Sequence, residues 1–429
     1  MIYPNITHKI IQRDSYIDLL PNIIEYLNKL RSDIHFTLIL PQFIKTLDFP
    51  NVEQVFLSFP NNANRMRTHF DSDKIKAIID PKNKDWDILY SQLPEHTLQL
   101  TNLFYNSTNI HPKIIGYCHW FETNESMSSR ERNMFLQNIS GILQMEECGV
   151  NSNWLKNFVL KKATKYFNDQ TIEKLSTIIQ PHYLGIDKIK RSTNFMSEPK
   201  LLLFNHRHNS YTGYKWLVGC LDKLWEQRKD FKLIVTHTDL KREYAEKFSA
   251  TKSEYMDNFN NIYLGIGAFK NYSSWSISVT DGFSRGVPYL LPNDLVYGEM
   301  IGEDYPLFYD NNEEAFLNKI NAVLDDPKLR VKAVKNIKPK MKDFLWDQRV
   351  SKWFGNWNTL FTAKDYKCIK PQSESYKKVI KYIRQNKCAS KKDILAMLGW
   401  GQTFGFSSIR NQLRCDKRIM LTENEYIWK

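Results

Sequence analysis

The sequence predicts an α/β protein with two Rossmann-like lobes followed by a small C-terminal domain. The prediction rests on the chain length, on the alternation of apolar runs with helical stretches, and on a change of pattern after residue 371. At 429 residues the chain exceeds what one hydrophobic core usually organises. An apolar content of 42% is typical of a globular protein. We expect domains at 1–180, 181–361 and 371–429.

The first lobe shows short apolar runs alternating with helical stretches. The runs are KIIQ (9–12), HFTLILP (35–41), VEQVFLSFP (52–60), IKAIID (75–80), DWDILYSQLP (85–94) and KIIGYCHWFE (113–122). The helical stretch SYIDLLPNIIEYLNKL covers 15–30. This alternation indicates a parallel sheet with helices on both faces.

The same alternation restarts at Lys200. The second series of apolar runs is KLLLFNHR (200–207), FKLIVTH (231–237), NIYLGIG (261–267), SWSISVTDG (274–282) and VPYLLPN (287–293). A second doubly wound unit should bind its ligand at the carboxyl ends of its strands. The stretch 342–361 predicts a long amphipathic helix with core-packing aromatic residues, and we assign it to the second lobe as a closing helix.

The pattern changes again after Ser373. Three short helices are expected within 375–387, 390–400 and 406–418, followed by a hairpin over 418–429. This is the outline of a winged helix, whose third helix reads a nucleic-acid groove. Candidate nucleic-acid contacts are the polar residues of that helix and the turn after it: Arg410, Asn411, Arg414, Lys417 and Arg418. Winged helices also serve as protein-interaction modules, so a docking role stays open.

The positive charge is concentrated at the C-terminus. The chain has a formal net charge of +13, and residues 371–429 contain 12 Lys and Arg against 5 Asp and Glu. A small basic region on a mildly basic body indicates a polyanionic partner, most often nucleic acid. DNA is favoured over tRNA as this partner.

The cysteines and the apolar runs predict a cytoplasmic protein. The six cysteines lie far apart and form no Cys-x-x-Cys pair, which indicates reduced thiols. No apolar run reaches about 18 residues, and the N-terminus lacks the features of a signal peptide. We expect no membrane span; for a bacteriophage protein the compartment would be the host cytoplasm.

A basic loop follows the first apolar run of the second lobe. The run LLLF ends at Asn205, and the loop contains Arg207 before a helix that Lys215 opens. Backbone amides and the helix dipole at such a point attract an anionic ligand. The loop therefore predicts a site for an anion, with Asn205, Arg207 and Lys215 as candidate binding residues.

Over residues 1–361 these features resemble the GT-B nucleotide-sugar glycosyltransferases of glycosyltransferase group 1, in particular the tRNA-queuosine mannosyltransferase-like enzymes. The resemblance implies that Arg207 and Lys215 bind the diphosphate of a sugar nucleotide. The run PNDLVYGEMIG (292–302) is similar to a Pro-Asn…Leu-x-Tyr-x-Glu run of that group. By this resemblance Glu299 lies near the ribose or the sugar hydroxyls.

The sequence departs from that family at one motif. Retaining GT-B enzymes have two glutamates separated by seven residues, and the matching positions here are Ser273 and Asp281. Asp281 would hold the ribose, while Gly282, Phe283 and Ser284 would face the diphosphate from a helix N-terminus. The missing first carboxylate leaves the sugar contacts open, and leaves open a catalytically inactive scaffold.

Four residues of the first lobe are candidate catalytic groups. The resemblance implies that His119 and Glu122, which follow an apolar run, lie beside the donor sugar. Glu95 and His96 follow another run and are candidate acceptor contacts or general bases.

These residues predict a metal-independent transfer. Neither Asp-Trp-Asp at 85–87 nor His-Arg-His at 206–208 has the ligand spacing of a metal site. The expected reaction moves a sugar from a UDP- or GDP-sugar to a hydroxyl, with no bound cofactor. The favoured acceptor is a hydroxymethylated pyrimidine in phage DNA; tRNA, a protein or a glycan, and an inactive nucleic-acid-binding scaffold are the alternatives. The sequence determines neither the sugar nor the oligomeric state.

Overall fold

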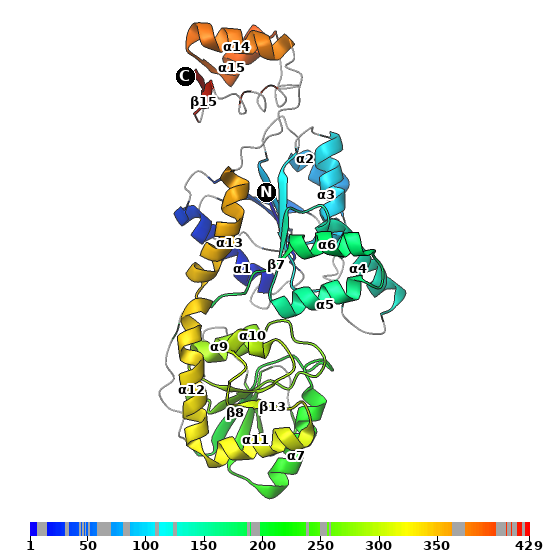
Figure 1. Cartoon of the computed structure of the whole chain (residues 1–429). Helices are drawn as coiled ribbons and strands as arrows, with labels where there is room; N and C mark the ends of the chain where they lie inside the picture. The colour runs from blue at the N-terminus through cyan, green and yellow to red at the C-terminus, as the bar shows by residue number, and fades with distance from the viewer. Residues whose placement is uncertain are drawn as a thin grey trace.

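The structure is a computed structural model with three regions (Figure 1). It describes residues 1–6, 15–30, 34–42, 44, 47, 49, 52–57, 70–79, 86–107, 111–122, 127–186, 189, 198–236, 240–248, 255–256, 259–362, 374–399, 409, 413, 418–422 and 425–429. None of the helices in this part of the chain is long and apolar enough to cross a membrane.

The first lobe is built on a parallel sheet of seven strands. In spatial order they are β3 (Val52–Leu57), β2 (Phe36–Pro41), β1 (Ile2–Tyr3), β4 (Ile88–Ser91), β5 (Lys113–Tyr117), β6 (Glu147–Val150) and β7 (Ile179–Pro181). Most residues of β2, β4 and β5 are buried, as expected for a sheet covered on both faces. The order reverses between β1 and β4, so this lobe has a topological switch point there.

Helices surround this sheet. They are α1 (Ser15–Leu30), α2 (Ser72–Ile79), α3 (Pro94–Ser107), α4 (Ser129–Ile142), α5 (Asn153–Ala163) and α6 (Asp169–Ile178). A capping box of Ser128 and Glu131 begins α4. The helices α3 and α4 approach closely at Gly141, where a Cβ atom would lie 1.7 Å from the carbonyl oxygen of Pro94.

Part of the expected pattern of the first lobe differs in the structure. The run at 75–80 belongs largely to α2, because Ile75 and Ile79 are spaced by four residues and bury one helical face. The run KIIQ (9–12) lies outside the described residues.

The second lobe contains a parallel sheet of six strands. Their spatial order is β10 (Ala245–Lys247), β9 (Phe231–Val235), β8 (Lys200–Phe204), β11 (Leu264–Ile266), β12 (Tyr289–Pro292) and β13 (Phe308–Tyr309). The order reverses between β8 and β11, which gives this lobe its own switch point. The α/β prediction with two Rossmann-like sheets is confirmed.

The helices of the second lobe are α7 (Tyr214–Gln227), α9 (Ile277–Ser284), α10 (Tyr297–Ile301), α11 (Glu313–Asp325) and α12 (Pro327–Met341), with short 3-10 helices at Phe259–Asn261 and Lys342–Phe344. The apolar run at 274–282 therefore contributes mainly to α9. The Ser276 side chain caps this helix by accepting from the amide of Val279.

The last helix of the two-lobed body returns to the first lobe. This helix, α13 (Trp346–Thr362), follows α12 along one side of both lobes (Figure 1). Val350, Trp353 and Trp357 belong to the core of the first lobe, so the assignment of 342–361 to the second lobe needs correction for this helix. Trp357 Nε1 donates to Glu147 at 2.9 Å, and the His182 ring stacks on Trp353. These contacts fix α13 beside β6 and β7.

The C-terminal region has its own small core. It contains α14 (Glu374–Asn386), β14 (Cys388–Ser390), α15 (Lys391–Met397), β15 (Ile419–Leu421) and β16 (Glu425–Trp428). The strands form an antiparallel sheet in the order β14, β16, β15. Two expected helices and the hairpin are therefore present. Of the third, only Ile409 and Leu413 lie within the described residues, and both are buried. The winged helix stays a prediction.

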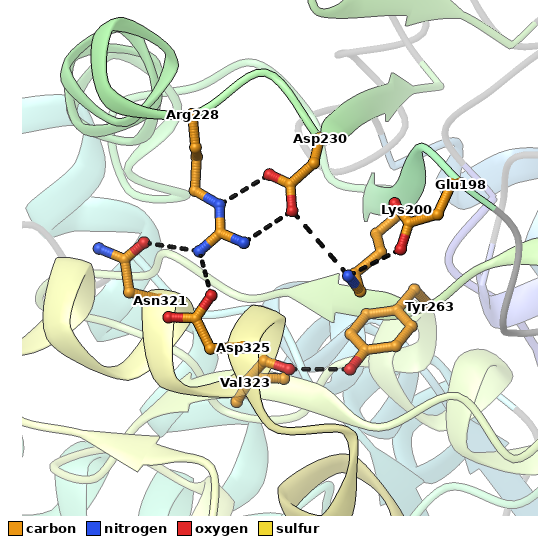
Figure 2. Close-up of polar contacts among 8 residues, drawn as sticks. All are labelled: Glu198, Lys200, Arg228, Asp230, Tyr263, Asn321, Val323 and Asp325. Atoms are coloured by element: carbon orange, nitrogen blue, oxygen red, sulfur yellow. Dashed lines mark hydrogen bonds and ion pairs between the residues drawn. The ribbon is translucent and has the colours of Figure 1, made fainter.

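An ionic cluster joins the amino ends of the strands in the second lobe (Figure 2). Arg228 donates to both carboxylate oxygens of Asp230, each at 2.7 Å, and also reaches Asn321 and Asp325. Lys200, at the start of β8, pairs with Glu198. The cluster lies at the sheet edge opposite the carboxyl ends and ties α11 to this lobe.

Candidate functional site

The candidate site lies at the carboxyl ends of the two parallel sheets. In the second lobe, residues 205–213 follow β8 and residues 267–276 follow β11, so these two loops flank the switch point. Ligands of doubly wound sheets bind at such a point because the chain leaves it in opposite directions on either side.

The two switch-point loops touch each other. Gly213 has φ +67°, and a Cβ atom there would lie 1.8 Å from the carbonyl oxygen of Ala268. The loop after β8 is closed internally by Thr212 Oγ1, which donates to the carbonyl oxygen of Arg207 at 2.6 Å. A glycine is required where the two loops meet and α7 begins.

The predicted diphosphate residues lie at this point. Arg207 and Lys215 are both exposed, and neither side chain has an acidic partner among the residues that the structure describes. Gly213 is the N-cap of α7, and no side chain caps this helix. The first amides of α7 and two cations are thus available to an anion.

Asn205 holds β8 to α9 in the structure. Its buried amide nitrogen donates to Tyr255 Oη at 2.7 Å and to the carbonyl oxygen of Ser278 at 2.9 Å. Its Oδ1 accepts from Tyr289 Oη at 3.2 Å. Because these contacts use most of the hydrogen-bonding capacity of the amide, Asn205 is suited to orient the switch-point loop.

The residues of the altered glutamate motif lie on and beside α9. Ser273 Oγ donates to Tyr297 Oη at 3.0 Å and is buried, while Asp281 is half-buried and raises the pKa of Tyr255 in addition to the larger effect of burial. Gly282, Phe283 and Ser284 occupy the second half of α9. The prediction that they lie at a helix N-terminus is therefore wrong. Gly282 packs on the Tyr289 ring, where a Cβ atom would lie 2.2 Å from Cε2.

Glu299 reaches from α10 to the first lobe. Its Oε1 accepts from the backbone amide of Asn153 at 2.6 Å and from Tyr183 Oη at 2.7 Å. Its Oε2 accepts from the backbone amide of Trp154 at 2.8 Å. A contact of Glu299 with a ribose stays a prediction; in the structure its carboxylate joins the two lobes.

The candidate acceptor residues lie at the switch point of the first lobe. Glu95 and His96 stand in the first turn of α3, directly after β4, and both are buried. His96 Nδ1 lies 3.2 Å from Tyr3 Oη at the end of β1. Burial raises the pKa of Tyr3 above its ordinary value, and the nearby Glu95 carboxylate adds to this.

His119 and Glu122 follow β5. Desolvation lowers the pKa of His119 to about 4, so the imidazole is neutral near pH 7. Glu122 contributes its carbonyl oxygen to a hydrogen bond from Lys162 Nζ at 2.8 Å, which fixes the loop after β5. A neutral imidazole can donate and accept hydrogen bonds.

Several side chains that are not among the predicted site residues bring the two sheet edges together. The exposed ring of Trp120, beside His119, faces Tyr211 of the second lobe at a centroid distance of 6.4 Å. Tyr272 packs edge-on against Trp154 at 5.4 Å. Asn151 Nδ2 donates to Ser274 Oγ at 3.2 Å. All of these residues lie in segments that follow strand ends, and that position is a signal in the sequence that could have pointed to them.

The predicted nucleic-acid contacts lie mostly outside the described residues. This holds for Arg410, Asn411, Arg414 and Lys417. Arg418 is described and exposed, with its guanidinium 5.4 Å from the Trp428 ring centroid. Within the described part of the chain, no group of three His, Cys, Asp or Glu residues could hold a metal ion; metal independence stays a prediction.

No family model and no curated protein matches this chain. Solved structures do. Sucrose-phosphate synthase from Thermosynechococcus elongatus has a TM-score of 0.65 at 11% identity, covering 82% of this chain and 94% of that one. Anabaena HepE in complex with UDP and glucose has a TM-score of 0.59 at 9% identity, covering 79% and 95%. A glycosyltransferase from Rickettsia africae has a TM-score of 0.56 at 15% identity, covering 80% and 94%. The chain has the GT-B fold, with two Rossmann-like sheets whose carboxyl ends face each other.

Proposed function

We propose that this protein is a glycosyltransferase that moves a sugar from a UDP- or GDP-sugar to a hydroxyl acceptor. The observation that carries the proposal is the basic switch-point loop of the second lobe, where Arg207 and Lys215 are exposed beside the uncapped start of α7. A nucleoside diphosphate supplies the negative charge that this arrangement attracts. HepE, which shares the fold, is described in complex with UDP and glucose.

The reaction breaks the bond between the anomeric carbon and the diphosphate oxygen and forms a bond to the acceptor oxygen. Arg207, Lys215 and the first amides of α7 stabilise the charge on the departing diphosphate. His119 binds a sugar hydroxyl as a neutral hydrogen-bond partner, because its pKa of about 4 makes it a weak base. Glu95 and His96 serve the acceptor side, where one of them takes the hydroxyl proton.

The proposed acceptor is a hydroxymethylated pyrimidine in phage DNA. The basic composition of residues 371–429 supports a nucleic-acid partner, and α14 presents exposed Lys377, Lys378, Lys381 and Arg384. Docking by this region would raise the local concentration of the polymer at the two-lobed body. The hydroxymethyl group must then be reached in the major groove or on a flipped base.

The test is a transfer assay with radiolabelled UDP- and GDP-sugars on three acceptors: hydroxymethylcytosine DNA, unmodified DNA and bulk tRNA. Label in the hydroxymethylated DNA alone is the expected result. Label in tRNA would make tRNA the acceptor in place of DNA. If no acceptor is labelled but the protein still binds DNA in a gel shift, the result would favour a catalytically inactive scaffold. Deleting 371–429 should raise the apparent KM for long DNA while leaving donor hydrolysis unchanged.

A further inference from the structure

We propose that Glu299 is a positioning residue that docks the second lobe onto the first by capping α5. The inference rests on the proposed function, because it assigns Glu299 a role in sugar transfer that differs from binding the donor. The Glu299 side chain extends from α10 towards the first lobe. Within the described residues its carboxylate accepts three hydrogen bonds, and all of them come from the first lobe or from the segment that follows it.

The amino end of α5 is completed by the other lobe. A helix leaves its first four amides without intrahelical partners. In α5 the first intrahelical bond runs from the amide of Lys156 to the carbonyl oxygen of Ser152. Of the amides before it, that of Leu155 donates to Ser152 Oγ. Glu299 accepts from those of Asn153 and Trp154. The cap of α5 is therefore shared between Ser152 and Glu299, which lies 146 positions after Asn153 in the chain.

Charge makes this contact specific. The first turn of α5 contains no acidic residue of its own, although its last turn carries Lys161 and Lys162. A negative charge at a helix N-terminus is stabilised by the helix dipole, and hydrogen bonds to a carboxylate are stronger than neutral ones. Glu299 supplies that charge from outside the lobe.

The contact lies where the lobes must be aligned. The helix α5 begins directly after β6, at the sheet edge that faces the second lobe. Tyr272 and Ser274, in the switch-point loop after β11, contact Trp154 and Asn151 beside it. Tyr183, the third donor to Glu299, lies in the segment that crosses between the lobes, and the Arg349 guanidinium lies 5.0 Å from its ring centroid. The cap thus sets the distance between the basic loop and the acceptor side.

The test uses Glu299→Ala and Glu299→Gln, with Asn312→Ala as the matched control. Asn312 caps α11 by accepting from the amide of Ala315 at 2.9 Å, entirely within the second lobe. Three quantities are measured: amide hydrogen exchange over residues 152–156, the dissociation constant of UDP, and the turnover of the donor sugar that the transfer assay identifies.

The expected result for Glu299→Ala is at least tenfold faster exchange at the start of α5, UDP affinity within threefold of the unchanged protein, and at least tenfold lower turnover. Glu299→Gln should give a smaller change in the same direction, because the amide keeps one acceptor but loses the charge. Asn312→Ala should leave the exchange of α5 and the turnover unchanged.

Two outcomes would overturn the proposal. If UDP affinity falls tenfold or more while the exchange of α5 stays as in the unchanged protein, Glu299 contacts the donor instead. If exchange rises but turnover does not change, the cap does not position the lobes for transfer. If the protein transfers no sugar at all, the exchange measurement still decides whether Glu299 caps α5. Failure of the proposed function can therefore be told apart from failure of the proposed cap.

Discussion

The two ends of the second-lobe sheet each carry a polar hub, and the hubs differ in what they join. At the amino ends, Arg228 bonds to Asp230, Asn321 and Asp325, all within one lobe (Figure 2). At the carboxyl ends, Glu299 bonds to Asn153, Trp154 and Tyr183, outside its own lobe. The first arrangement stabilises a lobe, and the second relates two lobes. Changes at the amino ends should therefore alter stability, and changes at the carboxyl ends should alter donor binding or turnover.

The largest effect is expected at the basic loop. Arg207→Ala and Lys215→Ala should each weaken UDP binding on the order of tenfold to a hundredfold, because each removes a charge-assisted contact to phosphate. The thermal unfolding temperature should not change, since both side chains are exposed. Isothermal titration calorimetry and a thermal scan measure the two quantities. Wild-type affinity in both variants would remove the assignment of this loop.

Asn205 tests whether one residue at the carboxyl ends can affect both the stability of the lobe and the binding of UDP. Asn205→Ala removes one hydrogen-bond partner each from the hydroxyls of Tyr255 and Tyr289 and from the carbonyl oxygen of Ser278. The Tyr289 hydroxyl still donates to that carbonyl oxygen at 3.0 Å. The free energy of unfolding should fall by about 2–3 kcal/mol, and UDP binding should weaken as well. Urea unfolding and calorimetry provide both values. Tyr289→Phe, which removes one hydroxyl, should cost about 1 kcal/mol.

At the amino ends, Arg228→Met should lower the free energy of unfolding by about 1–2 kcal/mol, because Asp230 loses a two-point partner. UDP affinity should remain unchanged. The matched control is Arg242→Met, whose pair with Asp222 is exposed on both sides and should contribute less to stability than the Arg228 pair. If the two variants lose the same free energy of unfolding in urea, Arg228 does not stabilise the lobe more than an exposed ion pair does.

The remaining effect appears only at acidic pH. The folded pKa of His119 is about 4, against an ordinary value of 6.5, so between these values the unfolded chain binds a proton that the folded chain does not. Stability should decrease as the pH falls from about 7 to 4. His119→Gln cannot take up this proton, so its free energy of unfolding should decrease less between pH 7 and pH 5. Chemical unfolding at both pH values measures this difference. An identical slope would show that His119 titrates normally.

The fold was easier to predict from the sequence than the site. Apolar runs such as 35–41 and 113–122 identified strands, because residues buried on both faces of a parallel sheet must be apolar. The run at 274–282 was less informative, since a short buried helix and a strand have similar composition. Its Ser276 cap places Gly282, Phe283 and Ser284 away from the helix N-terminus.

Local patterns predicted Arg207 and Lys215 as anion-binding residues, because a basic loop between a strand and a helix has its own signature. They could not identify the partners of Glu299, whose contacts lie 146 and 145 residues away along the chain. The role of Asn205 was hidden for the same reason, since Tyr255, Ser278 and Tyr289 are separated from it in sequence.

The chain passes between the lobes twice, and the two passages are bonded to each other. The Ile186 amide donates to the carbonyl oxygen of Phe344 at 2.7 Å, and the Trp346 amide donates back to that of Ile186 at 3.2 Å. The second lobe is thus an insertion within the first, and residues before Ile186 cannot form a complete first core without α13. The two passages meet at a single bridge between Ile186 and Leu345. Any opening of the two lobes should therefore bend both passages at this one place, which would act as the pivot.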